Sequence, residues 1–225
     1  MAITEELKDM HIARYNMYNF CRNLFEMVPG EDFYKMLNEM LPHLEVLAKG
    51  DNEDIKIGVN GILDFLTQYN SKVGLEKSDF ELEVSRAYTS VLCIPGVAPQ
   101  VESIYTSKEG LTCQESRDEM LALFDKYSVE LPDTIHQDYD HLFSELAFMA
   151  YLIKSTYDAE CEYAYEGLIV EQLEMHVNHF DKWIYSFLDK LGKASVSEVK
   201  LYVSISHFVK GFLQEDKAYL EEELN

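Results

Sequence analysis

The chain has 225 residues, of which 47% are hydrophobic and 27% are charged, an ordinary composition for a globular protein. Its formal net charge of −22 opposes binding to nucleic acid and to anionic membrane surfaces, and it would attract a basic partner. The start MAITEELKDMHIARY lacks the apolar core of a signal peptide, and no apolar run approaches the length of a bilayer span. We therefore expect a cytoplasmic protein without stable membrane association.

Helical periodicity governs the first third of the chain. Thr4, followed by two glutamates, begins a predicted helix that ends near Val28. A second helix is expected at about 32–48, with a kink at Pro42. A third is expected at about 53–69, where two glycines weaken the helical pattern.

Three later helix starts are predicted from capping boxes, in which a hydroxyl and a carboxylate three residues apart satisfy the free amides of the first turn. The boxes and the helices they predict are Ser78-x-x-Glu81 for 79–94, Thr112-x-x-Glu115 for 113–128, and Ser195-x-x-Glu198 for 196–213. Part of the last segment, VKLYVSIS, also alternates like a strand, but its cap and the following HFVKGFL favour a helix. Further helices are expected from Leu142 onward and over about 159–191.

Two segments are predicted to be non-helical. Residues 94–110 contain two prolines and two glycines and are expected to form an ordered loop or a functional lid. Residues 129–137 form a shorter, proline-containing break and the best candidate for a domain boundary. The predicted organisation is all-α, a bundle of about 8–11 helices with an N-terminal part at 1–129, a hinge or linker at 130–139, and a smaller C-terminal helical part at 140–225 packed on the first.

The segment 138-DYDHLFSELAFMAYLI-153 combines an apolar stripe with a polar start. Asp138 and Asp140 precede the helix, where its positive dipole end favours anions. His141 and Glu145 are one turn apart and can pair. Capping accounts for these charges, although it does not explain their position beside the main break of the chain.

Catalytic motifs are weak. The sequence has no Gly-rich nucleotide-binding motif and no nucleophile elbow. His136, His141, His176 and His179 lie near acidic residues, but they lack the spacing of a zinc or di-iron ligand set. The four cysteines are far apart and are expected to be reduced, mostly buried thiols. We therefore expect no catalytic residues, no metal site and no cofactor.

Aromatic and methionine side chains form stripes that suit either a core or a groove for an apolar peptide helix. The residues concerned are Tyr88, Val91, Leu92, Phe148 and Met149. Periodicity alone favours the core, and both interpretations stay open at this point.

The segment DHLFSELAFM, residues 140–149, resembles the D-H-L-x-x-E-L-x-F-M signature of the TorD/DmsD/NarJ family of molybdoenzyme maturation chaperones. Four other segments resemble family motifs in the same order: AYTSVL (87–92), PQVESIY (99–105), HFDKW (179–183) and the final FLQED. The family commonly has E-P-P before its D-H-L, where this chain has Gln137, Asp138 and Tyr139.

The resemblance implies an all-helical protein without turnover chemistry that binds the twin-arginine leader, or a terminus, of an apo-molybdoenzyme catalytic subunit. It would assist molybdopterin cofactor insertion and delay export until folding is complete. The implied peptide-binding residues are Tyr88, Val91, Leu92, Phe148 and Met149 for apolar contacts, Glu102, Asp140 and Glu145 for basic groups, and His141 for orienting the site.

The residues also leave two alternative functions open: a metal-dependent helical enzyme, or an acidic scaffold subunit of a stable complex. Exchange of helices across the break at 129–139 could also produce a homodimer.

Overall fold

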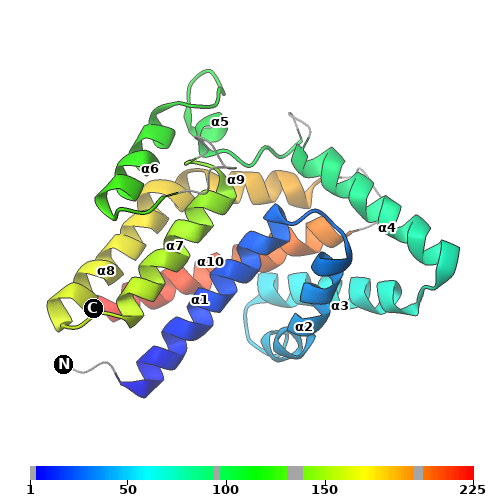
Figure 1. Cartoon of the computed structure of the whole chain (residues 1–225), viewed down its shortest axis with the longest axis horizontal. Coiled ribbons are helices and arrows are strands. Elements are labelled where there is room, and N and C mark those ends of the chain that lie inside the picture. Colours follow the sequence, from blue (N-terminus) through cyan, green and yellow to red (C-terminus); the bar gives the residue numbers. More distant parts are fainter. Residues whose placement is uncertain (1–3, 94–96, 131–138, 195–199) are drawn as a thin grey trace. The chain divides into compact units, whose positions relative to one another are not determined.

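The computed structural model describes residues 4–93, 97–130, 139–194 and 200–225, and in these ranges the protein is all-α (Figure 1). The predicted fold class is thus confirmed. Within the described ranges no helix has the length and apolar character needed to cross a bilayer.

The helices are named in chain order. The α-helices are α1 (Glu5–Glu26), α2 (Glu31–Leu47), α3 (Glu53–Ser71), α4 (Gly74–Tyr88), α5 (Glu102–Thr106), α6 (Glu115–Lys126), α7 (Leu142–Tyr157), α8 (Glu162–Met175), α9 (Asp181–Gly192) and α10 (Leu201–Glu223), and the π-helical turns are η1 (Thr89–Cys93) and η2 (His176–Phe180).

The helices form two compact units, each assembled from separate stretches of chain. The first unit comprises 1–23, 100–185 and 215–225, and the second comprises 24–99 and 186–214. Residues on both sides of the break at 130–139 therefore lie in the same unit. Residues 131–138 are outside the described ranges, so the hinge expected there stays a prediction.

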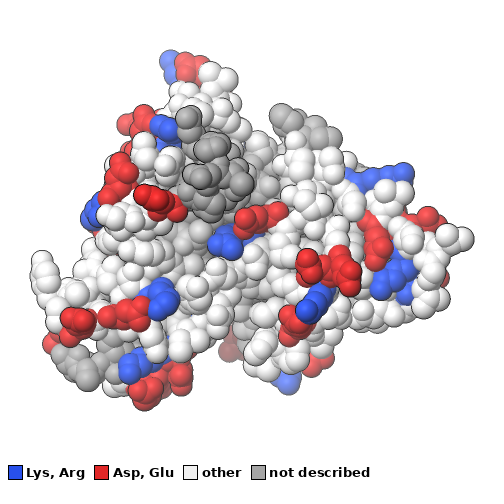
Figure 2. Space-filling view, in the orientation of Figure 1, with Lys and Arg blue, Asp and Glu red and all other residues white. Residues whose placement is uncertain are grey.

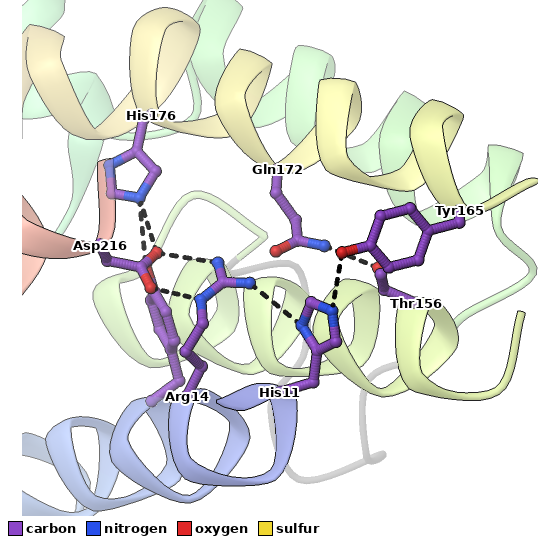
Figure 3. Close-up of polar contacts among 8 residues, drawn as sticks. His11, Arg14, Thr156, Tyr165, Gln172, His176 and Asp216 are labelled. Carbon is purple, nitrogen blue, oxygen red and sulfur yellow. Dashed lines mark hydrogen bonds and ion pairs between the residues drawn. The ribbon is translucent and has the colours of Figure 1, made fainter. Parts of the chain in front are cut away.

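A buried polar network joins α1, η2 and α10 within the first unit (Figure 3). Arg14 donates from Nε to Asp216 Oδ1 at 2.6 Å and from Nη2 to Oδ2 at 3.1 Å. The Tyr18 hydroxyl donates to Asp216 Oδ2 at 2.8 Å, and His176 Nε2 lies 3.2 Å from the same oxygen. His11 extends the network to the Tyr165 hydroxyl of α8 at 3.2 Å. A buried ion pair with this many hydrogen bonds holds three helices of the unit in one register.

Charge and burial set the ionisation of this network. Burial alone would raise the pKa of Asp216, but the Arg14 guanidinium and the hydrogen bond from His176 outweigh it and hold that pKa well below its usual range. Burial, followed by the positive charge of Arg14, lowers the pKa of His11 to about 4. The network therefore contains an ionised Asp216 and a neutral His11 at neutral pH.

The second unit is built around aromatic side chains and a close approach of α3 to α10. Tyr34 and Tyr69 stack with ring centroids 4.2 Å apart, and Phe65 and Phe80 stack at 5.5 Å. A Cβ atom at Gly58 of α3 would collide with the backbone of α10, including the Cα atom of residue 208 at 2.6 Å. The glycines that weaken the helical pattern of α3 are thus the positions that let two helices touch.

Two of the predicted capping boxes are wrong. Ser78 lies inside α4, where its hydroxyl donates to the Gly74 carbonyl at 3.4 Å, because the helix begins five residues earlier than its box predicts. Thr112 does not cap α6, because the helix begins at Glu115 after Cys113, whose φ of 57° is incompatible with a helix. The third box, at Ser195, lies outside the described residues.

Other expectations have mixed outcomes. The helical interpretation of VKLYVSIS is confirmed by α10 from Leu201 onward, and Thr4 caps α1 by accepting from the Leu7 amide at 3.3 Å. The segment expected as one loop at 94–110 contains the short helix α5. Burial of the cysteines is wrong for three of the four: only Cys21 is buried, and all four are free.

Candidate peptide-binding site

The polar start of α7 is capped by His141. Its Nδ1 accepts the Phe143 amide at 3.4 Å, and its ring lies against that of Phe143 with centroids 4.1 Å apart. The predicted pairing of His141 with Glu145 is wrong, because Glu145 points into the core and binds another partner. Burial lowers the pKa of His141 to about 4, so the half-buried imidazole is a neutral acceptor at neutral pH.

Backbone hydrogen bonds join the residues before α7 to those before α5. The Glu102 amide donates to the Asp140 carbonyl at 2.9 Å, and the Leu142 amide donates to the Gln100 carbonyl at 2.9 Å. These two bonds form an isolated antiparallel bridge between Val101 and His141. Two of the segments that resemble family motifs, 99–105 and 140–149, therefore lie side by side.

Asp140 anchors three elements with one carboxylate. Its Oδ2 accepts from the Ser103 amide at 2.9 Å, from the Ser103 hydroxyl, and from the Ser116 hydroxyl at 3.2 Å. Ser103 is in α5 and Ser116 is in α6, while Val101, which precedes α5, makes no side-chain cap. The Asp140 side chain thus supplies the missing cap of α5. It is buried, and its predicted contact with basic groups of a client stays a prediction.

Glu102 and Glu145 are also buried and bound within the protein. Glu102 Oε2 lies 2.8 Å from His179 Nδ1, and Glu145 Oε2 accepts the Trp183 indole N–H at 3.0 Å. Both glutamates are 0% exposed. The third resembling segment, HFDKW, therefore meets the first two through its histidine and its tryptophan.

The surroundings of Glu145 favour its protonated form. Burial raises its pKa well above the usual value, the neighbouring charge of Glu102 raises it further, and the Trp183 hydrogen bond only partly offsets them. The Oε1 atoms of Glu102 and Glu145 have no other hydrogen-bond partner among the described residues. A proton shared between these two carboxyl groups would satisfy both oxygens.

Four of the five predicted apolar contacts are buried core residues. Phe148 is 0% exposed and stacks on Phe124 of α6 with centroids 4.9 Å apart, and Met149 is also 0% exposed. Val91 and Leu92 are buried in η1, and Tyr88 is half-buried at the end of α4. These last three belong to the second unit, whereas the other six predicted site residues belong to the first.

Four residues of this site were not among those predicted: Ser103, Ser116, His179 and Trp183. His179 and Trp183 are four residues apart, so a helix directs both to one side, and the H-x-x-x-W spacing was a usable signal. Ser103 and Ser116 carry no such signal, since their partner Asp140 is 37 and 24 residues away.

The described residues form an all-α protein with a buried polar site at the start of α7, and they contain no group of three or more side chains placed to hold a metal ion. The family model described as nitrate reductase delta subunit matches residues 50–189. A protein named chaperone protein TorD from Vibrio parahaemolyticus serotype O3:K6 (strain RIMD 2210633) is 23% identical over 219 residues, which cover 96% of this chain and 98% of the relative. Another of the same name from Vibrio vulnificus (strain YJ016) is 26% identical over 222 residues, with 96% and 98% covered.

The chain therefore belongs to the nitrate reductase delta subunit (NarJ/TorD) family, which confirms the predicted family. The family is one of non-catalytic chaperones for molybdoenzyme maturation, so the metal-dependent enzyme considered from the sequence is wrong.

Proposed function

We propose that this chain is a cytoplasmic chaperone that binds the twin-arginine leader, or a terminus, of an apo-molybdoenzyme catalytic subunit. Binding would hold the client while its molybdopterin cofactor is inserted and would delay export until the client has folded. The observation that carries the proposal is the family match, which includes the α5 and α7 segments joined by Asp140.

The chemistry of the chain suits such a client. A leader has a pair of arginines and an apolar, helix-prone stretch, and a protein with a net charge of −22 attracts the first. Phe148 and Met149 are fully buried in the free protein, so they would meet a client only after local opening around α7. Such opening makes binding weaker, which suits a client that must be released; micromolar affinity corresponds to about 8 kcal/mol.

In this proposal the buried and the half-buried residues of the predicted site have different roles. Asp140, Glu102 and Glu145 shape the site from inside, and half-buried His141 is the member that a client can reach. Tyr88, Val91 and Leu92 remain proposed apolar contacts in the second unit. Homodimer formation by helix exchange also remains a proposal.

The test is a titration of the purified chain with synthetic leader peptides, followed by pull-down of apo-molybdoenzyme subunits. The single tryptophan, Trp183, lies in the site and gives an intrinsic fluorescence signal. His141→Gln should weaken binding, while His43→Gln on the exposed surface of α2 should not. A chain that binds no leader and no apo-subunit would refute the proposal, and stable co-purification with one partner would indicate a scaffold subunit instead.

A further inference from the structure

A hollow of about 360 Å³ lies within the first unit between α6 and the α8–η2 segment. Its apolar lining consists of Ala122, Leu123 and Met175. Its polar lining consists of Glu119, Glu171, Glu174, Asn178, His179 and Lys182. The hollow is thus lined by apolar side chains together with three glutamates.

His179 contacts the candidate site at α7 with one ring nitrogen, Nδ1, and it also lines the hollow. Its Nδ1 lies 2.8 Å from Glu102 Oε2, and its Nε2 has no hydrogen-bond partner among the described residues. The His179 side chain is only 4% exposed. When Nδ1 of a neutral ring donates to Glu102, Nε2 is an acceptor. An unpartnered ring nitrogen of a buried side chain therefore lines the hollow.

Two carboxylates on the walls are also unpaired. Glu119 of α6 and Glu174 of α8 are exposed, and neither forms an ion pair or hydrogen bond with another described residue. Glu171 differs, because Lys126 neutralises it at 2.5 Å. Lys182 is the cation that lines the hollow. Figure 2 shows carboxylate side chains over the part of the surface where α6 lies in Figure 1.

We infer that this hollow binds an arginine side chain of the client's basic segment. A guanidinium offers several N–H donors and accepts nothing, so it matches a site that presents His179 Nε2, Glu119 and Glu174 as acceptors. The methylene stem of the arginine would lie on Leu123 and Met175. The inference rests on the proposed function, and it adds the α6–α8 hollow to the predicted contacts of Glu102, Asp140 and Glu145 with basic groups of the client.

The hollow is linked to the candidate site at α7 through His179 and Glu102. Glu102 holds His179 in place, and a neighbouring hollow of about 490 Å³ shares Glu119 and Lys182 with the first and is also lined by Glu102. An arginine pair could therefore place one guanidinium on each side of Glu119. The neighbouring hollow adds two more carboxylates, Glu109 and Glu115.

The experiment compares two surface variants with equal net charge. Glu119→Gln/Glu174→Gln removes the unpaired carboxylates of the hollow, and Glu166→Gln/Glu45→Gln removes two exposed carboxylates elsewhere. Each is titrated with a synthetic leader peptide that has two adjacent arginines before an apolar stretch, and with the same peptide carrying two glutamines. All four substituted positions are exposed, so folding should be preserved.

We expect the hollow variant to bind the arginine peptide roughly three- to tenfold more weakly than the wild type, with a smaller dependence on salt. The control variant should bind like the wild type, and the glutamine peptide should not distinguish the two variants. A third variant, His179→Gln, should weaken binding of the arginine peptide without altering the affinity for the glutamine peptide.

Equal affinity of all variants for the arginine peptide would overturn the inference and leave the proposed function intact. Equal weakening by the hollow and control variants would also overturn it, since that result indicates long-range attraction only. Failure of the wild type to bind the arginine peptide or any apo-subunit would refute the proposed function, and the inference with it.

Discussion

Trp183 donates its indole N–H to the buried carboxyl of Glu145 at 3.0 Å, and this bond joins α9 to α7 inside the first unit. Tyr105 of α5 lies against the same indole, with ring centroids 5.4 Å apart. A single side chain thus connects three of the segments that build the candidate site.

Replacement of Trp183 by phenylalanine should destabilise the protein. The change removes the donor and leaves a buried oxygen of Glu145 unsatisfied, which costs about 1–3 kcal/mol. Chemical denaturation measures the change in the free energy of unfolding. In a Glu145→Leu background the same replacement should cost less, because the acceptor is absent; an equal cost in both backgrounds would show that packing alone matters here.

The proton on Glu145 should be visible in the pH dependence of stability. A carboxyl whose pKa is raised in the folded state keeps its proton after the unfolded state has lost it, so its stabilising contribution is complete below about pH 4.5 and falls as pH rises toward the folded pKa. Glutamine imitates the protonated acid and donates to Glu102. Glu145→Gln should therefore fold at neutral pH. Its free energy of unfolding should lack the part of the pH dependence that Glu145 contributes, which is at most about 1.4 kcal/mol per pH unit.

The comparison is made by urea denaturation at several pH values between 5 and 8. Glu174→Gln, which replaces an exposed carboxyl in the same unit, should retain the wild-type slope. Parallel curves for Glu145→Gln and the wild type would show that Glu145 is ionised in the folded protein.

Asp216→Asn should weaken the first unit severely. The substitution leaves the Arg14 guanidinium, which is 5% exposed, without its counter-charge, and breaking a buried pair in this way costs about 3–5 kcal/mol. The pKa of Asp216 is lowered in the fold, so its contribution is present above about pH 4 and is lost as pH falls. The variant should therefore lack part of the acid sensitivity of the wild type.

Thermal unfolding between pH 3 and pH 7 checks this expectation. His11 adds sensitivity of the same sign between its unfolded pKa near 6.5 and its folded pKa of about 4, and that part should persist in the variant. Asp189→Asn, at an exposed position of α9, is the matched control and should follow the wild type. An Asp216→Asn variant as stable as the wild type would contradict the assigned role of the ion pair.

Local patterns in the sequence were sufficient to predict the helical class and most helix ranges. The apolar stripe from Leu142 onward and the segment at about 53–69 both appear as helices, α7 and α3. Two capping boxes failed, since a hydroxyl three residues before a glutamate also occurs inside a helix, as at Ser78. Propensity defines a helix interior better than its first turn.

The candidate site was only partly accessible to sequence reasoning. The motif resemblance located Glu102, Asp140 and Glu145, but polarity alone suggested that they face a client. The structure shows that each binds a partner far away in the chain, such as His179, which is 77 residues from Glu102. Pairings of that kind depend on tertiary packing and leave no local trace in the sequence.

Gly58 provides a test of packing in the second unit. From propensity alone, Gly58→Ala should stabilise α3 by roughly 1 kcal/mol, because alanine favours a helix. In the structure the added methyl would meet Phe208 Cβ at 2.6 Å as well as backbone atoms of α10, so α3 and α10 would have to separate. Overpacking of this kind costs about 1–3 kcal/mol, and we expect net destabilisation.

Gly167→Ala is the matched control, because Gly167 of α8 has open space where its Cβ would be, and it should be neutral or stabilising. Both variants can be compared by thermal and urea unfolding. Hydrogen exchange of the α3 and α10 amides would localise the effect, and faster exchange in both helices is expected only for Gly58→Ala. Stabilisation by Gly58→Ala would mean that propensity, and not contact with α10, determines the residue at this position.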